Sequence, residues 1–311
     1  MATTLPRAIC LTLLVGSVVR AAGGLGQEPA PPIFSSESDL VVLHVTVFDR
    51  HGDSVAHLNR DVFHVVEDGT PQTISMFSGE DAPVAVGLVV DNSSSMLTRR
   101  GMVMAGVMAF AESSKPEDQA FTIVFNEHVR RGLPDTVAFT SNATLLQASL
   151  AAIPPGGMTA LHDAVIAGLD QLDMAERQKH VLVVLSDGDD NASRQREDDM
   201  LHRAERSNAL IYAVSTARLD SSVGNERLLR KLARSTGGEL YTPRTERDVV
   251  AAFAEIAGNI RQGYTIGYVP TNAAHDGSYR KLIVRALVPG IRPPVVHVRD
   301  GYLAPLHPHE R

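Results

Sequence analysis

The stretch VAVGLVVDNSSS, residues 84–95, decides the fold class of this 311-residue chain. Its first part, residues 84–90, is a continuous apolar run, which is typical of a strand covered on both faces of a sheet. Its second part, residues 91–95, holds an acidic and three hydroxyl side chains. We therefore predict a buried parallel strand that ends in a polar loop.

Outward from this strand, short apolar segments alternate with segments of helical periodicity. Further strands are predicted at residues 121–125, 181–185, 209–214 and 239–241, with a connecting edge strand at 128–140. Helices are predicted at residues 98–112, 142–152, 159–174, 194–207, 223–235 and 245–260. This alternation indicates a doubly wound α/β domain with a mostly parallel sheet over residues 83–260.

The α/β segment is flanked on both sides by sequence that predicts only strands. The first flank, residues 37–82, contains the hairpin turn Asp68-Gly69, and the second flank covers residues 264–305. We expect the two flanks to pair into one small β-sandwich, with the α/β domain inserted between them. Two separate β appendages are the alternative. Residues 306–311 are expected to form a polar tail.

The N-terminus has the features of a secretory signal peptide. Arg7 precedes the apolar run 8–19, which is too short to span a bilayer and is followed by small residues. We assign residues 1–24 to the signal peptide and the Pro-rich residues 25–36 to a flexible leader. An anchor that is never cleaved is the alternative. The expected location is secreted, periplasmic or in the cell envelope, and no transmembrane segment is predicted in the mature chain.

The composition excludes several classes of protein. The chain is 44% hydrophobic and 21% charged, which is ordinary for a globular protein. A net charge of −7 and the absence of Trp disfavour a nucleic-acid-binding protein. The single cysteine, Cys10, lies inside the predicted signal peptide, so the mature chain would need no disulfide.

Oxygen-bearing side chains follow the predicted strands at the positions where open parallel sheets bind ligands. Asp91, Ser93 and Ser95 follow the first buried strand, Thr159 follows a Gly-Gly pair, and Asp187 follows a later strand. Two carboxylates and three hydroxyls, without His or Cys, suit Mg²⁺, or Mn²⁺ or Ca²⁺ in its place, better than Zn²⁺. The alternative is that these residues only form turns and helix caps.

The same residues resemble the metal-ion-dependent adhesion site of von Willebrand factor A domains. The family pattern D-x-S-x-S matches Asp91, Ser93 and Ser95, its separate Thr matches Thr159, and its later Asp matches Asp187 within Ser-Asp-Gly. Met158 between Gly157 and Thr159 is a small departure from the pattern. The resemblance covers residues 83–260, and the flanks look like a bacterial family of secreted proteins related to these domains.

The resemblance implies a metal-dependent adhesion or assembly module. Its partner would be a protein that brings an acidic group to the metal ion. A structural envelope scaffold with a stabilising metal is the alternative, and a hydrolase is a remote one, since the chain lacks the G-x-S-x-G, H-E-x-x-H and phosphate-loop motifs. We therefore expect no enzymatic activity. In some related domains the last helix moves when the site is occupied, which would here involve residues 245–260.

Three neighbouring acidic or amide residues receive a simpler interpretation. Asp189, Asp190 and Asn191 are expected to form a solvated loop beside the site rather than to bind the metal. Asp163 lies one helical turn after Thr159, where it would either support the metal ligands from outside or only cap the site.

Overall fold

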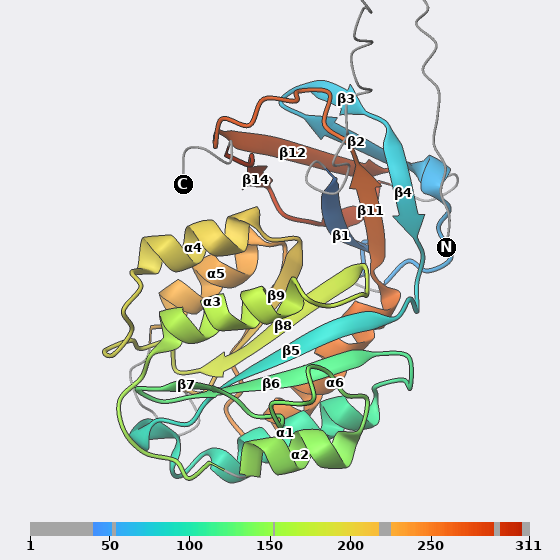
Figure 1. Ribbon diagram of the computed structural model, residues 1–311. Coiled ribbons are helices and arrows are strands. Elements are labelled where there is room, and N and C mark those ends of the chain that lie inside the picture. The colour runs from blue at the N-terminus through green and yellow to red at the C-terminus, as the bar shows by residue number, and fades with distance from the viewer. Residues whose placement is uncertain (1–39, 52–53, 152, 218–224, 289–292, 307–311) are drawn as a thin grey trace, which may run out of the picture. The chain divides into compact units, whose positions relative to one another are not determined.

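The computed structural model describes residues 40–51, 54–151, 153–217, 225–288 and 293–306 (Figure 1). The predicted signal peptide, the leader and all but the first residue of the predicted tail lie outside these residues. Among the described helices, none is both long enough and apolar enough to cross a membrane.

A six-stranded sheet forms the centre of the α/β part, in the order β10-β9-β8-β5-β6-β7. All neighbouring strands are parallel except β7, which pairs antiparallel with β6 at the edge. Their bounds are β5 (Val84–Asp91), β6 (Gln119–Phe125), β7 (Val129–Arg131), β8 (Lys179–Ser186), β9 (Ala209–Ser215) and β10 (Leu240–Tyr241). The predicted doubly wound, mostly parallel sheet is confirmed.

The strand β5 shows why its sequence is apolar throughout. Ala85 and Val89 belong to the hydrophobic core on one face of the sheet, whereas Val86 and Leu88 belong to the core on the other face. Because successive side chains of a strand point to opposite faces, a strand between two cores cannot alternate apolar with polar residues.

Helices cover both faces of this sheet (Figure 1). The core on one face takes side chains from α3, α4 and α5, the core on the other face takes them from α6, and α1 and α2 contribute to both. Their bounds are α1 (Arg100–Glu112), α2 (Ala143–Ala151), α3 (Leu161–Leu172), α4 (Glu197–Arg206), α5 (Glu226–Ser235) and α6 (Glu246–Gln262). The start of α6 is set by Thr245 and Asp248, whose side chains each accept a hydrogen bond from the other residue's backbone N–H.

The strands of the two flanks form two four-stranded sheets, in the orders β13-β1-β11-β4 and β14-β12-β2-β3. Their bounds are β1 (Val41–Phe48), β2 (Phe63–Glu67), β3 (Thr70–Gln72), β4 (Ile74–Ser78), β11 (Tyr264–Tyr268), β12 (Tyr279–Ala286), β13 (Val295–His297) and β14 (Gly301–Leu303). In each sheet an N-terminal strand pairs antiparallel with a C-terminal one, β1 with β11 and β2 with β12. One core joins both sheets, so the flanks form a single sandwich.

Two expectations about strands were wrong. The predicted edge strand at 128–140 is a strand only over Val129–Arg131, because the chain turns at Gly132 and Pro134 has no N–H to donate to a ladder. The short strand β14 was not predicted, since three residues are too few to show a pattern.

Buried polar contacts join the sandwich to the α/β part. The ring of His44 on β1 contacts the carbonyl oxygen of Asn208 at 2.9 Å. Arg299, which follows β13, donates to the carbonyl oxygen of Ser207 at 2.9 Å and to that of Val42 at 3.0 Å. These contacts fix the segment after α4 against β1.

Candidate metal centre

Two loops meet at the carboxyl end of β5. The backbone N–H of Ser94 donates to the carbonyl oxygen of Gly157 at 3.1 Å, and that of Gly156 donates to the carbonyl oxygen of Asn92 at 2.9 Å. Gly156 and Gly157 both have positive φ angles, +154° and +85°. At Gly157 this conformation favours glycine, which lets the chain turn toward the Asp91 loop just before Thr159.

Asp91 is the last residue of β5, and its carboxylate is buried. Its Oδ1 accepts the backbone N–H of Ser93 at 2.9 Å, and its Oδ2 accepts the hydroxyl of Ser186 at 2.7 Å. The pKa of Asp91 is raised to about 6, mainly by burial and to a smaller extent by the charge of Asp187, although the hydrogen bonds of Ser93 and Ser186 act in the opposite direction. The site therefore holds a carboxylate that costs free energy to ionise.

The two serines of the motif lie next to each other. The hydroxyl oxygens of Ser93 and Ser95 are 3.1 Å apart. Ser93 is buried, whereas Ser95 is exposed. The Asp91 loop therefore presents a group of oxygen atoms that runs from the interior to the surface.

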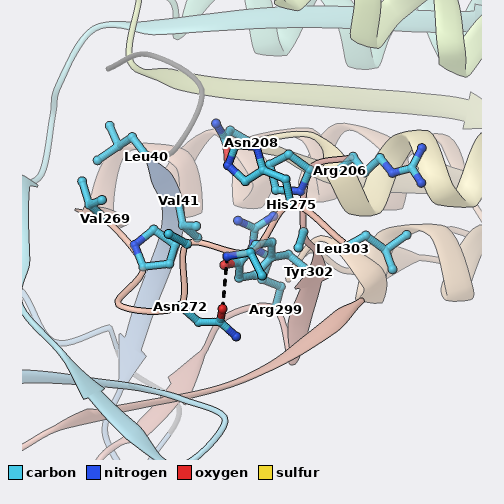
Figure 2. A pocket seen from close by; sticks show the side chains of 15 residues that line it. Leu40, Val41, Arg206, Asn208, Val269, Asn272, His275, Arg299, Tyr302 and Leu303 are labelled. Atoms are coloured by element: carbon cyan, nitrogen blue, oxygen red, sulfur yellow. Dashed lines mark hydrogen bonds between the residues drawn. The ribbon is translucent and has the colours of Figure 1, made fainter. Parts of the chain in front are cut away.

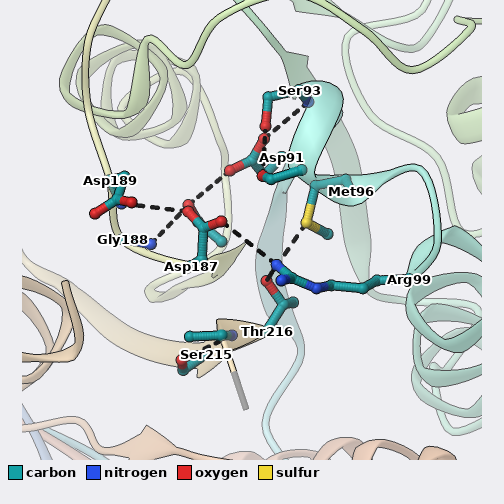
Figure 3. Close-up of polar contacts among 12 residues, drawn as sticks. Asp91, Ser93, Met96, Arg99, Asp187, Gly188, Asp189, Ser215 and Thr216 are labelled. Carbon is teal, nitrogen blue, oxygen red and sulfur yellow. Dashed lines mark hydrogen bonds and ion pairs between the residues drawn. The ribbon is translucent and has the colours of Figure 1, made fainter. Parts of the chain in front are cut away.

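Asp187 follows β8 and is buried beside Asp91 (Figure 3). Its Oδ1 accepts the backbone N–H of Asp189 at 3.3 Å. Its Oδ2 lies 3.4 Å from Nη1 of Arg99, an ion pair in which the side chain of Arg99 is only 1% exposed. The same Nη1 lies 3.4 Å from the hydroxyl oxygen of Thr216.

Thr159 is positioned through its backbone. Its N–H donates to Oδ1 of Asn191 at 2.8 Å, and its carbonyl oxygen accepts the N–H groups of Asn191 and Ala192 at 2.9 and 3.0 Å. The loop after Asp187 is thus bonded to the segment that carries Thr159. The structure brings the loops of all five predicted residues to one edge of the sheet.

The loop at 189–191 is solvent-exposed at Asp189 and Asn191, as expected, but it also holds the neighbouring segment through hydrogen bonds. Asn191 binds the backbone of Thr159, and Asp190 accepts the N–H of His162 at 3.0 Å and the hydroxyl of Ser193 at 2.6 Å. Asp189 and Asn191 are exposed there, and Asp190 is half-buried. Loop residues that look solvated in sequence serve here to hold the preceding segment, because buried backbone groups need partners.

Asp163 caps the loop rather than facing the cluster around Asp91. Its two carboxylate oxygens accept the backbone N–H groups of Arg194 and Gln195 at 3.0 and 2.9 Å. These bonds hold the segment that leads into α4.

Arg99, Ser186 and Glu127 also belong to the site, and the sequence did not single them out. Arg99 carries no pattern that marks it as buried, and Ser186 is part of the Ser-Asp-Gly motif without having been considered for contact with Asp91. Glu127 accepts the backbone N–H of Met158 at 3.0 Å and supports the glycine loop from outside.

The donor chemistry decides which metal ion the residues fit. Within the described residues, no three His, Cys, Asp or Glu side chains come together in a metal-binding group. The cluster instead combines two carboxylates with the hydroxyls of Ser93 and Ser95, and Thr159 on the adjoining loop carries a further hydroxyl. All of these are hard oxygen donors that suit Mg²⁺ better than Zn²⁺. Arg99 is the cation that pairs with Asp187, while Asp91 is satisfied by hydrogen bonds. The residues therefore fit a hard divalent cation.

The sequence model of the von Willebrand factor type A domain matches residues 86–255, more than half of the chain. The chain therefore belongs to the von Willebrand factor type A domain family, as the resemblance in sequence predicted. No curated protein is similar enough in sequence to count as a match.

Solved structures of this fold superpose on the chain. A von Willebrand factor type A protein from Catenulispora acidiphila is 13% identical, with a TM-score of 0.51, over 88% of this chain and 76% of that one. An aerotolerance-related membrane protein from Bacteroides fragilis is 17% identical over 57% of this chain and 98% of its own, with a TM-score of 0.48. The von Willebrand factor domain of the pilus tip protein Mfa5 from Porphyromonas gingivalis is 14% identical over 58% of this chain and 95% of its own, with a TM-score of 0.48.

Proposed function

We propose that this chain is a protein-binding module whose contact depends on a divalent metal ion. Asp91, Ser93, Ser95, Thr159 and Asp187 would hold Mg²⁺, with Mn²⁺ or Ca²⁺ as substitutes. When bound, the ion offers a coordination position to a carboxylate of the partner protein, since Mg²⁺ is seldom saturated by protein ligands alone. The observation that carries the proposal is the pair of buried carboxylates, Asp91 and Asp187, beside the hydroxyls of Ser93 and Ser95.

The electrostatics of the cluster support this role. Two buried carboxylates in one site repel each other, and the raised pKa of Asp91 reflects both its burial and the charge of Asp187. A divalent cation stabilises both carboxylates in their ionised form. Arg99 pairs with only one of them, Asp187, so the two carboxylates together keep a net negative charge that a divalent cation would compensate.

We also propose that the protein is exported and acts by binding rather than by catalysis. Arg7 and the apolar run 8–19 support export through a signal peptide. The chain lacks the catalytic motifs considered above, and Ser93 stands where a D-x-D phosphotransfer motif would have its second carboxylate. An acidic group on a protein of the cell envelope is therefore the proposed ligand.

The test is affinity capture from the native envelope fraction, with the full chain immobilised. The protein is compared with Asp91→Asn, which keeps the shape of the side chain, and with the control Asp189→Asn, an exposed carboxylate of the same site. We expect a partner that the wild type and the control retain in Mg²⁺ and release in EDTA, and that Asp91→Asn does not retain. Equal capture in EDTA would refute metal dependence. Calorimetry that detects Mg²⁺ binding without any Mg²⁺-dependent capture would favour the scaffold alternative.

A further inference from the structure

A second site lies outside the proposed metal centre. A pocket of about 110 Å³ opens between the β-sandwich and the end of α4 (Figure 2). Its walls are mainly apolar and include Leu40, Val269 and Leu303, whereas Arg206, His275 and Arg299 are its basic lining residues. The volume is smaller than that of pockets for drug-sized ligands, so it suits a small group.

Arg299 is the buried cation of this pocket. Its guanidinium donates to the carbonyl oxygens of Ser207 and Val42, which uses two of its five N–H groups. Its Nε is buried and has no hydrogen-bond partner among the residues that the structure describes. Within the part of the chain that the structure describes, Arg299 forms no ion pair with a carboxylate.

The carboxylate of Glu67 is hydrogen-bonded to two tyrosines. Its Oε2 accepts the hydroxyls of Tyr268 and Tyr302 at 2.6 and 2.9 Å. The ring of Tyr302 instead packs against the guanidinium of Arg299, whose central carbon lies 5.4 Å from the ring centroid. An aromatic ring stabilises a buried cation only in part, because a ring carries no net charge.

A second arginine adds positive charge near the same wall. Arg280 is buried, and its Nη2 donates to the carbonyl oxygen of Ala274, which lines the pocket, and pairs with Asp276. Its Nε and Nη1 have no partner. Burying a charge is costly unless it is paired and hydrogen-bonded, so two incompletely satisfied guanidiniums point to an anion as the missing partner.

We propose that this pocket binds a carboxylate carried on a short apolar body. The guanidinium of Arg299 would hold the carboxylate, and the walls formed by Leu40, Val269 and Leu303 would receive the apolar part. Such walls disfavour a hydrated inorganic anion, because phosphate would lose its water without gaining enough hydrogen bonds. The ligand would be a small branched carboxylic acid or the C-terminus of a polypeptide whose last residue is apolar.

The test uses the full chain and isovalerate as the probe, with the neutral isovaleramide as its matched analogue. Both are titrated in EDTA, so that no metal ion can bind the carboxylate and failure of the proposed metal centre does not affect the result. We expect isovalerate to bind about tenfold or more tightly than the amide, the difference that one hydrogen bond to a charged group provides. Equal binding of acid and amide, or no binding of either, would overturn the proposal.

Two variants locate the binding. Val269→Glu adds a carboxylate to the pocket at a side chain that is 55% exposed, and we expect about a tenfold or greater loss of isovalerate affinity. The control Val250→Glu makes the same change on α6, outside the pocket, at a side chain that is 37% exposed. Retained binding in Val269→Glu contradicts the assignment, whereas its loss in Val269→Glu alone supports it.

Competition distinguishes the sources of the carboxylate. Displacement of isovalerate by N-acetyl-Ala-Leu supports the proposal and assigns the site to polypeptide C-termini, whereas isovalerate binding without such displacement supports it and assigns the site to free small acids. Displacement by inorganic phosphate at equal concentration would overturn the choice of a carboxylate.

Discussion

The guanidinium of Arg99 lies 3.4 Å from the carboxylate of Asp187, and both side chains are buried at the carboxyl edge of the central sheet. A cation built into the chain therefore occupies part of the space around a proposed metal ligand (Figure 3). Arg99 pairs with Asp187 when no metal ion is bound, and it would compete with the proposed metal ion for that carboxylate. The proposed affinity for Mg²⁺ is accordingly a balance between these two cations.

Replacing Arg99 by Met should separate the two effects. Without Mg²⁺, the variant should lose about 3 kcal/mol of unfolding free energy, because a buried carboxylate is left without its partner. Its affinity for Mg²⁺ should rise about tenfold, because Asp187 is then free to bind the ion. Denaturant unfolding in EDTA and calorimetric titration with Mg²⁺ measure the two quantities.

The neighbouring Arg100 provides the control. It donates to the carbonyl oxygens of Ile153 and Leu150 rather than to a carboxylate. Arg100→Met should therefore lower stability without tightening Mg²⁺ binding. An unchanged or weaker Mg²⁺ affinity in Arg99→Met would contradict the competition.

Ser95 and Ser94 allow a test of the motif that hardly disturbs the fold. Both residues are exposed, and only Ser95 belongs to the D-x-S-x-S pattern, with its hydroxyl beside that of Ser93. Ser95→Ala should weaken Mg²⁺ binding about tenfold through the loss of one oxygen donor, while Ser94→Ala should leave it unchanged. Calorimetry on the two variants decides between a metal site and a turn, and equal affinities would favour the turn.

Gly188 controls the position of the loop that follows Asp187. Its φ is +88°, and an added Cβ would lie 2.5 Å from the carbonyl oxygen of Asn225. Gly188→Ala should cost about 1–3 kcal/mol of unfolding free energy and weaken Mg²⁺ binding, because the backbone next to Asp187 must move. Gly258→Ala on α6, where nothing lies within 4 Å of the new methyl group, should instead be neutral or stabilising.

His44 makes the junction between the sandwich and the α/β part sensitive to acid. Its ring contacts the carbonyl oxygen of Asn208 and the hydroxyl of Thr265. The pKa of His44 is lowered to about 3, mainly by burial and to a smaller extent by the charges of Lys179 and Arg299. Because the folded-state pKa lies below the unfolded value of 6.5, His44 favours folding above pH 6.5 and loses this contribution as the pH falls toward 3.

The expected loss from His44 is about 2 kcal/mol between pH 7 and pH 5. His44→Gln keeps a polar side chain without the titration, so its unfolding free energy should fall less than that of the wild type over this range. Chemical denaturation at the two pH values measures the difference. An equal fall in unfolding free energy for the wild type and His44→Gln would show that protonation of His44 does not contribute to the loss of stability in acid.

Much of the fold could be predicted because the deciding features are local. The apolar run at 84–90 and the later alternation of strands and helices reveal a parallel sheet with two covered faces, since burial on both faces leaves no polar position in a strand. Short elements were harder to predict from the sequence. Neither the three-residue strand at Gly301–Leu303 nor the early end of the strand at Arg131 has a periodic signal, because pairing with a neighbouring strand determines both.

By itself, the sequence determined the class of fold and five oxygen-bearing residues of the candidate site, because strand periodicity and motif spacing are properties of neighbouring residues. Only the tertiary structure decided which ion pairs and hydrogen bonds compensate the charges of the two carboxylates among them. It brought Arg99 next to Asp187, 88 positions along the chain, and placed the hydroxyl of Ser186 within hydrogen-bond distance of Asp91. It also buried Arg299 beside a pocket, where no carboxylate among the described residues pairs with it. The physical reason is that the cost of a charge depends on its burial and its partners, and both arise only when distant segments meet.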